Sequence, residues 1–290
     1  MTRLREDDIE KIPGNLEDYD ARLERMTGAS LRQIACYASS VDEDLIMDVS
    51  DRVRIAVVPV TSGLGVIRGF SDTVAAIVSH LGFKTFVTES CDEAGISEGN
   101  RRGADILMFA DDERFVALTP DWHHVVDNSR ATAQGFVAGL DLMKGGLAGE
   151  SVLVLGCGPL GLAATKAIID RGAEVALCDI QQERALAALR GIGPDASDRI
   201  RMESTSQTVL DRYELILDAT NVGHFIEPSH LTPDTYVAAP GMPNALTPEA
   251  MAEHRDRILH DALEIGTATM AVQSAAELAG RTDARKANEG

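Results

Sequence analysis

Apolar runs and amphipathic stretches alternate along the chain from Arg54 onward. The runs Ile55–Val60, Thr85–Thr88 and Ile106–Ala110 predict strands, and Ile67–Leu81 repeats apolar residues at helical spacing. Strands that alternate with helices in this way are typical of a parallel α/β sheet. We therefore expect an α/β unit in the first half of the chain.

Further patterns flank this region. Residues 3–27 place apolar side chains at helical intervals with a break at Pro13-Gly14, which predicts two short amphipathic helices that pack on the body or act as a lid. Phe115–Leu118 predicts a hairpin strand, and residues 122–124 read as a surface loop. Ser129–Lys144 predicts a long connecting helix.

The stretch from Ser151 to Asp179 is the most informative part of the sequence. The apolar run Val152–Leu155 leads into the turn GCGPLG at residues 156–161, a helical stretch continues to about Arg171, and a second apolar run ends at Asp179. This order of strand, glycine turn, helix, strand and acid is the dinucleotide-binding βαβ pattern. Its simpler alternative is a glycine-rich turn in another parallel α/β domain.

Each glycine of the turn has a separate physical role. Gly156 permits the tight turn, Gly158 lets the backbone approach a pyrophosphate, and Gly161 lets the helix pack closely on the strand. Pro159 and Leu160 then begin the helix, whose free N–H groups attract phosphate. A nucleotide cofactor is therefore expected here.

The cofactor expected from these residues is NAD. The Asp179 carboxylate can accept hydrogen bonds from the adenosine ribose hydroxyls and would repel a 2′-phosphate, and residues 180–182 include no arginine. Polar and rigid strand ends later in the chain, at Ala219-Thr220 and Pro240-Gly241, are predicted to contact the cofactor and its nicotinamide.

These patterns together predict an α/β protein of two domains. Residues 1–144 are expected to form an N-terminal α/β domain with leading helices that binds substrate. Residues 145–290 are expected to form a C-terminal Rossmann domain with a doubly wound parallel sheet. The last helix can pack back on the first domain, and 281–290 are expected to fray.

Charge and cysteine usage limit the partners. Lys and Arg number 27 against 46 Asp and Glu, so the net charge is −19, which opposes binding to nucleic acid or an anionic membrane. The same charge suits a cationic small molecule or serves solubility alone. The four cysteines show no metal-ligand spacing, so we expect no metal and a cytoplasmic location, and a homodimer remains open.

Polar residues follow several predicted strands of the first half. Thr61-Ser62, Thr88-Glu89 and Asp111-Asp112 close three strands and are expected to converge on one crevice, where Asp111 can bind an ammonium group. Asn128 lies in a polar triplet that either caps the next helix or faces the crevice. Asp261 precedes a glycine-containing bend and is either a helix-start acid or a second acid of the site.

Six segments give the chain a family resemblance. They read PVTSGLGVI, FADDERF, VVDNSRATA, GCGPLG, APGMP and EIGTATM. Together they resemble the pyrrolysine synthase (PylD) family, over nearly the whole chain from the N-terminus to about Met270. The first two segments are specific to that family, whereas the glycine turn alone is not.

The resemblance implies an amine dehydrogenase of amino-acid biosynthesis. It implies that NAD oxidises the terminal amine of L-lysine-Nε-3-methyl-D-ornithine to a semialdehyde with release of ammonia, and that intramolecular imine formation then gives pyrrolysine. Substrate contacts fall on Ser62, Asp111 and Asn128, and Leu4 and Ile9 match the apolar closing helix. Asp261 stands where the family has an acid. The catalytic residues implied are Asp111, Asn128 and Asp261.

Two other functions remain open from the residues. One is an NAD-dependent dehydrogenase of an amino acid or a shikimate-like acid. The absence of lysine from the candidate segments counts against amino-acid and folate-type dehydrogenases of this two-domain layout, because both use a catalytic lysine. The other is a non-catalytic sensor of NAD(H), which the lack of a basic DNA-binding segment disfavours.

Overall fold

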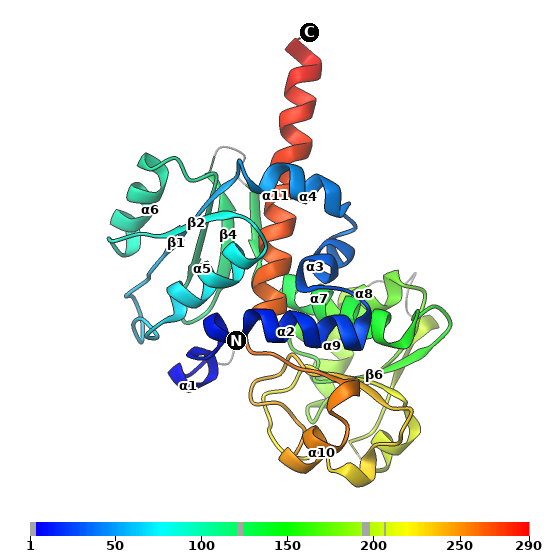
Figure 1. Ribbon diagram of the computed structural model, residues 1–290. Helices are drawn as coiled ribbons and strands as arrows, with labels where there is room; N and C mark the ends of the chain where they lie inside the picture. Colours follow the sequence, from blue (N-terminus) through cyan, green and yellow to red (C-terminus); the bar gives the residue numbers. More distant parts are fainter. Residues whose placement is uncertain (1–3, 121–123, 193–197, 206, 290) are drawn as a thin grey trace.

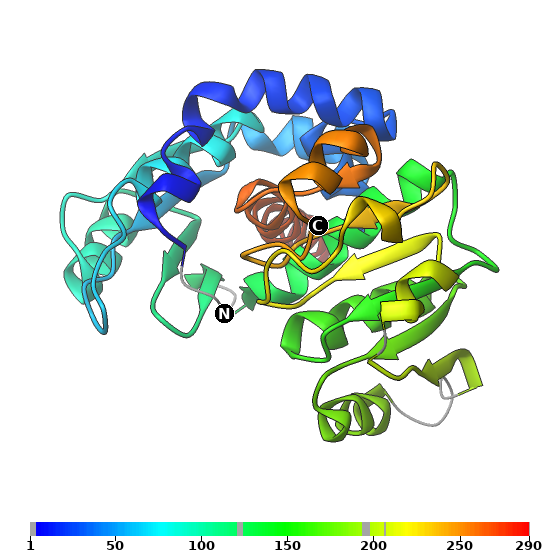
Figure 2. The same ribbon diagram turned by 90° about the horizontal axis from the view of Figure 1, so that it is seen from below.

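The computed structural model describes residues 4–120, 124–192, 198–205 and 207–289. Four helices precede the first strand: α1 (Glu6–Ile9), α2 (Ile12–Thr27), α3 (Leu31–Ser39) and α4 (Glu43–Ser50). The break between the first two falls before α2 rather than at Pro13-Gly14, because Pro13 lies in the first helical turn, where its missing N–H has no cost. Figure 2 shows α1 and α2, in dark blue, along one side of the molecule.

The first sheet contains five strands in the order β2-β1-β3-β4-β5. Their bounds are β1 (Arg54–Val58), β2 (Lys84–Val87), β3 (Ile106–Ala110), β4 (Phe115–Thr119) and β5 (His124–Asp127). Strands β2, β1 and β3 run parallel, whereas β4 and β5 continue the sheet antiparallel as two hairpins. Part of the predicted loop at 122–124 is therefore strand, since His124 pairs with Thr119; Trp122 and His123 lie outside the described residues.

Helices cover both faces of this sheet. Helix α5 (Phe70–His80) packs on the face that carries Ile55 and Val57, and α6 (Asp92–Arg101) packs on the opposite face with Ala56 and Val58. Alternate residues of one strand point to opposite faces, so a strand covered on both sides is apolar throughout. This explains the continuous apolar run that the sequence shows at β1.

The second sheet is a Rossmann sheet. Its strands are β6 (Ser151–Leu155), β7 (Glu174–Cys178), β8 (Ile200–Met202), β9 (Leu215–Asp218), β10 (Tyr236–Ala238) and β11 (Ile258–Leu259). All pairs are parallel, in the order β8-β7-β6-β9-β10-β11. In chain order this is the doubly wound 3-2-1-4-5-6 arrangement, so the predicted Rossmann fold is confirmed.

Short helices connect the strands of the second sheet. They are α8 (Pro159–Asp170), α9 (Gln182–Ile192) and α10 (Pro248–Glu253), with 3₁₀ turns η3 (Gln207–Arg212), η4 (Pro228–His230) and η5 (Arg255–Arg257). Helix α8 follows β6 and α9 follows β7, as the βαβ pattern predicts. The order of strands reverses beside β6, which is where such sheets bind ligands.

Two long helices join the two sheets. Helix α7 (Asn128–Lys144) leads from the first sheet to the second, and α11 (Glu264–Glu289) returns to contact α3, α4 and α5. A Cβ at Gly135 of α7 would overlap Ile265 and Thr269 of α11, so glycine allows this close packing. Figure 1 shows α11, in orange and red, beside the first sheet and continuing beyond it to Glu289, where the sequence suggested a frayed end.

Candidate functional site

A cavity of about 810 Å³ lies between the first sheet and the Rossmann sheet. Its lining comes from the carboxyl ends of strands in both sheets and from the N-terminal segment. From the residues that the sequence singled out, the cavity brings together Leu4, Ser62, Asp111, Asn128, Gly156, Gly158, Pro159, Leu160, Asp179, Ala219, Thr220, Pro240 and Gly241. The candidate cofactor-binding residues and the candidate substrate-binding residues therefore line the same cavity.

The glycine turn after β6 has the geometry of a phosphate-binding loop. Gly156 has φ 88°, in the left-handed region that favours glycine. Gly158 caps the N-terminus of α8 and a Cβ placed on it would meet nothing within 4 Å, so space for a ligand is open there. Gly161 faces inward, because a Cβ there would overlap the Gly156 carbonyl. The structure thus fits the separate roles predicted for the three glycines.

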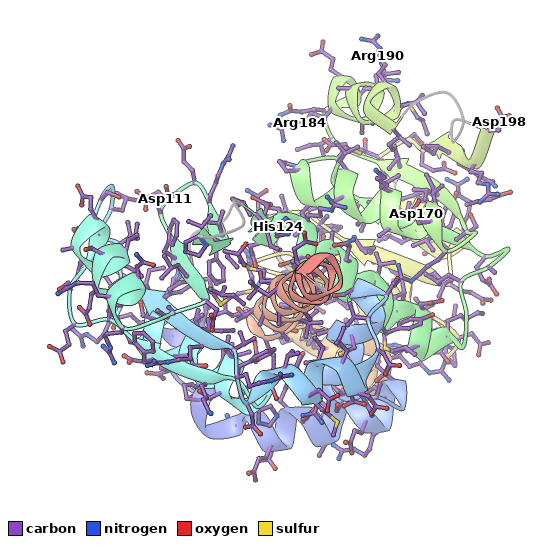
Figure 3. The ribbon with its side chains drawn as sticks, turned by 90° about the horizontal axis from the view of Figure 1, so that it is seen from above. Asp111, His124, Asp170, Arg184, Arg190 and Asp198 are labelled. Carbon is purple, nitrogen blue, oxygen red and sulfur yellow. The ribbon has the colours of Figure 1, made fainter. Side chains whose placement is uncertain are left out.

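Asp179 follows β7 and holds this turn in place. Its Oδ2 accepts a 2.7 Å hydrogen bond from the Cys157 amide, and its Oδ1 accepts one of 2.7 Å from Gln181. A carboxylate oxygen has more than one lone pair, so both oxygens can still accept from ribose hydroxyls. Arg184 of α9 also lines the cavity, five positions after Asp179, and the sequence argument did not include it. Figure 3 labels Arg184 on this helix.

The buried carboxyl of Asp218 holds the loops that carry several of the candidate cofactor-binding residues. Asp218 is fully buried, and its oxygens accept hydrogen bonds from Thr220 and from the Ala245 amide. Burial raises the pKa of Asp218. Gly241 packs against the Thr220 carbonyl and the Asp218 carboxyl, which leaves no space for a Cβ. This arrangement fixes Thr220 and Gly241 in the cavity wall.

The first sheet contributes the polar wall that faces these loops. Ser62 follows β1 and Asp111 follows β3, its neighbour in the sheet, and both line the cavity. The third predicted strand end does not join them: Thr88 is buried, and the Glu89 amide donates to Glu98 of α6. Because β2 is the edge strand, its carboxyl end lies farther from the centre of the sheet.

Asp111 is held as an ionised carboxylate. Its Oδ1 accepts hydrogen bonds of 2.7 Å from the Arg114 amide and 2.8 Å from the Glu113 amide. These backbone donors lower the pKa of Asp111. A carboxylate with a lowered pKa is a poor proton acceptor near neutral pH but a good partner for an ammonium group. Figure 3 shows Asp111 on the first-sheet side of the molecule.

The polar residues 127–129 at the start of α7 serve two different roles. Asp127 is the N-cap, since its carboxylate accepts from the Ser129 and Arg130 amides. Asn128 and Ser129 instead line the cavity. The Asn128 Oδ1 accepts a 3.2 Å hydrogen bond from Thr132, and Gly266 of α11 packs against both side chains.

Asp261 lies behind the cavity wall rather than in it. It is 8 % exposed, and its Oδ2 accepts a 2.6 Å hydrogen bond from the Tyr19 hydroxyl of α2. Its neighbours Ala262 and Leu263 line the cavity. Ile9 is also fully buried and absent from the cavity lining, and among the described residues of α1, α2 and the segment before them, which starts at residue 4, only Leu4 lines the cavity.

A second buried acid, Glu264, accompanies Asp261. Burial and the Asp261 charge raise the pKa of Glu264 to about 8, and burial also raises the pKa of Asp261. The sequence shows both acids in this segment, and the sequence argument selected Asp261 for the site without identifying Tyr19 as its partner. Only the fold brings Tyr19 to Asp261, which lies 242 positions later in the chain.

The described residues contain neither a metal-ligand cluster nor a membrane-spanning helix. Over residues 4–120, 124–192, 198–205 and 207–289, no group of three His, Cys, Asp or Glu side chains can hold a metal ion. Within the same part of the chain, no helix is both long and apolar enough to span a membrane.

Comparison with known families places the first half of the chain. The family model described as "Pyrrolysine biosynthesis protein PylD, N-terminal domain" matches residues 8–126. Residues 8–126 are therefore similar to the N-terminal domain of PylD proteins. The match includes Ser62 and Asp111, and the resemblance that the sequence motifs carry is thereby confirmed.

Two curated relatives extend the likeness to PylD over the whole chain. The pyrrolysine synthase of Methanosarcina acetivorans is 26 % identical over 275 residues, covering 93 % of this chain and 98 % of the relative. That of Methanosarcina barkeri is 27 % identical over 272 residues, covering 93 % and 97 %. Both sheets are therefore included in the similarity to PylD proteins.

A solved structure supports the fold independently. The chain is similar to quinate dehydrogenase from Corynebacterium glutamicum in complex with NAD, with a TM-score of 0.53 and 16 % identity over 79 % of this chain and 96 % of that one. At this identity the likeness concerns the fold.

Proposed function

We propose that this chain is an NAD-dependent oxidoreductase of pyrrolysine biosynthesis. Its substrate is L-lysine-Nε-3-methyl-D-ornithine, whose terminal amine is oxidised to a semialdehyde with release of ammonia. Attack of the α-amine on the aldehyde and loss of water then close the pyrroline ring. The observation that carries the proposal is the shared cavity, in which PylD-family residues Ser62 and Asp111 face the glycine loop of a Rossmann sheet.

The cavity has the charge that such a substrate requires. Among its described lining residues the charged side chains are Asp111, Asp112, Asp179 and Arg184, so carboxylates outnumber the single guanidinium. Asp111 and Asp112 lie on the first-sheet side, away from the glycine loop. An ammonium group of the substrate is thus attracted to Asp111, while Ser62 and Asn128 supply hydrogen bonds beside it.

The proposed oxidation requires a group that accepts a proton. An amine gives up hydride only when its nitrogen has a free lone pair, so the ammonium form must first lose a proton. Asp111 is ill-suited to accept it because of its lowered pKa. The pair of Asp261 and Glu264 has raised pKa values and lies directly behind Ala262 and Leu263 of the wall, which supports a role in proton transfer through water.

The residues present fit NAD as the cofactor. Gly156, Gly158 and the first turn of α8 would hold the pyrophosphate, and Asp179 would accept from the ribose. Ala219, Thr220, Pro240 and Gly241 would contact the nicotinamide end. When bound, NAD supplies the acceptor for the hydride. In this proposal residues 1–144 bind the substrate and 145–290 the nucleotide.

Ring closure needs little from the protein. The α-amine and the aldehyde belong to one molecule, so a pocket that holds the chain folded back brings them together. Because hydrolysis of the imine formed by oxidation consumes water, the pocket must also admit water. Leu4 and the apolar side chains around Phe70 and Phe115 give the wall that shapes the substrate.

A turnover experiment tests the proposal. The protein is mixed with NAD and the lysyl-methylornithine amide, and reduced nicotinamide, ammonia and the product mass are followed together. We expect one equivalent each of reduced nicotinamide and ammonia per pyrrolysine formed. Turnover of a free amino acid or a shikimate-like acid in place of the amide would favour the alternative dehydrogenase, and tight NADH binding without any turnover would favour a sensor.

A further inference from the structure

Two carboxylates hold the loop at Thr61–Gly65 from opposite sides. On one side Asp92, the first residue of α6, accepts hydrogen bonds from the Thr61 amide at 2.8 Å and the Thr61 hydroxyl at 2.5 Å. The Ser62 amide also donates to this carboxylate, and these donors together lower the pKa of Asp92. The loop is therefore held by a side chain whose ionised form these donors favour.

On the other side the loop meets Asp112. The Leu64 amide donates a 2.7 Å hydrogen bond to Asp112 Oδ2. Gly63 has φ 71°, and a Cβ placed there would overlap the Asp112 carboxylate. Glycine is thus required both for the backbone conformation and for the approach of the loop to the turn that carries Asp111.

The backbone of Asp92 indicates that its position is enforced. Its φ is 54°, a left-handed conformation that side chains with a Cβ seldom adopt, although Asp tolerates it better than most. Such a conformation persists where surrounding contacts outweigh its cost. Here the contacts are those to Thr61 and Ser62, and Asp92 itself does not appear in the cavity lining.

We propose that Asp92 and Asp112 are positioning residues that hold Ser62 at a fixed place relative to Asp111 in the cavity. Asp92 anchors the start of the loop to α6, and Asp112 anchors its middle to the β3–β4 turn. Ser62 lies between the two anchors, which hold the loop backbone that carries its side chain. The consequence for substrate affinity rests on the function proposed above.

The variant Asp92→Gly separates anchoring from folding. Glycine adopts the left-handed conformation without strain, and this relief offsets part of the lost hydrogen bonding, so we expect an intact fold with a small fall in melting temperature. The Thr61 and Ser62 amides lose their acceptor, so their hydrogen exchange, followed in full-length protein without ligand, should accelerate about tenfold or more. Unchanged exchange of both amides would overturn the proposal whatever the activity.

Kinetics with the lysyl-methylornithine amide give the second readout. Loss of hydrogen bonds to a charged group that positions Ser62 should raise KM about tenfold, with a smaller change in kcat and no change in the Kd of NAD. The control Glu93→Gln removes a negative charge one position away, from an exposed side chain, and should match the parent protein. Equal effects of the two variants would attribute the loss to charge and overturn the anchoring role.

The two proposals fail in different ways. If the parent protein does not turn over the amide, the proposed function fails, while the amide exchange of Asp92→Gly still tests the anchor. If the parent protein is active and Asp92→Gly retains its KM, the anchor has no role in binding and this inference is wrong.

Discussion

The Tyr19 hydroxyl donates a 2.6 Å hydrogen bond to Asp261, which lies 242 positions later in the chain. Arg22, one helical turn after Tyr19, donates to the His260 carbonyl of the same loop. Helix α2 is therefore fastened to the segment before α11, which forms part of the cavity wall at Ala262 and Leu263. The N-terminal segment, the buried acids and the cavity form one connected structure.

The first prediction concerns Tyr19→Phe and the pH dependence of turnover. If the Asp261–Glu264 pair takes up the substrate proton, kcat/KM rises with pH through the pKa of Glu264, about 8. The two acids titrate as a coupled pair, and the Tyr19 donor stabilises the ionised pair through Asp261, so its removal should raise the midpoint of this rise by up to about one unit. The measurement is kcat/KM from about pH 6 to about pH 10, a range that extends roughly two units to either side of the expected midpoint.

Tyr37→Phe is the matched control. Tyr37 also donates from an N-terminal helix to a buried acid, Asp141, at 2.5 Å, but neither residue lines the cavity. This variant should lower the free energy of unfolding by about 1 kcal/mol without moving the pH midpoint. A common midpoint for Tyr19→Phe and the parent protein would show that the pair does not control the rate.

The second prediction is a loss of stability as pH rises. The pKa of Glu264 is raised from 4.5 to about 8 in the folded protein, so between these values the folded state binds a proton that the unfolded state releases. Its contribution to stability is complete below about pH 4.5 and is lost as pH rises through 8. Glu264→Gln stays neutral and should flatten this part of the curve.

Denaturant unfolding at several pH values measures the slope. Asp218 also has a raised pKa and contributes in the same direction, so the slope in Glu264→Gln should fall without reaching zero. An undiminished slope would mean that Glu264 is not protonated in the folded protein. Exposed Glu249→Gln, on α10, serves as the control and should leave the slope unchanged.

The third prediction contrasts two glycines of the same turn. Gly161→Ala would force a methyl group against the Gly156 carbonyl, so it should lower the free energy of unfolding by about 2 kcal/mol. Gly158→Ala has open space and φ −72°, so its fold should lose no more than about 1 kcal/mol. The methyl group would instead occupy the approach of the pyrophosphate.

Thermal unfolding and NAD titration distinguish the two variants. Gly158→Ala should retain most of its stability and bind NAD at least about tenfold more weakly, because a cofactor phosphate needs contact with bare backbone. Full NAD affinity in Gly158→Ala would contradict the assignment of this turn to the pyrophosphate. For Gly161→Ala the larger change should be in melting temperature.

Local patterns predicted the elements well and their assembly only in part. The βαβ unit follows from apolar runs and glycines within one short stretch, and the structure has the predicted strand β3 at Ile106–Ala110. Strand β11 has two residues, too few to give a periodic signal. Its place at the sheet edge depends on pairing with β10, which is a tertiary interaction.

The candidate site likewise contains residues that local patterns could predict and residues whose position depends on tertiary packing. Ser62, Asp111 and Asn128 follow strand ends or begin a helix, so topology alone could direct them to one cavity. Asp261 was expected in that cavity and lies behind its wall, because the bend before α11 places Ala262 and Leu263 in the wall instead. The side that a loop residue faces depends on packing against α2, which no local pattern records.

The last prediction concerns the choice of cofactor. Asp179 would repel a 2′-phosphate, whereas Arg184 lines the same end of the cavity and could pair with one. Asp179→Ser should therefore improve kcat/KM with NADP by about tenfold or more and weaken that with NAD. In Asp179→Ser/Arg184→Ala the gain with NADP should disappear, because no cation then faces the phosphate. Arg190→Ala, which changes another exposed arginine of α9 (Figure 3), is the control and should retain the gain; an equal loss in that variant would assign the effect to net charge rather than to Arg184.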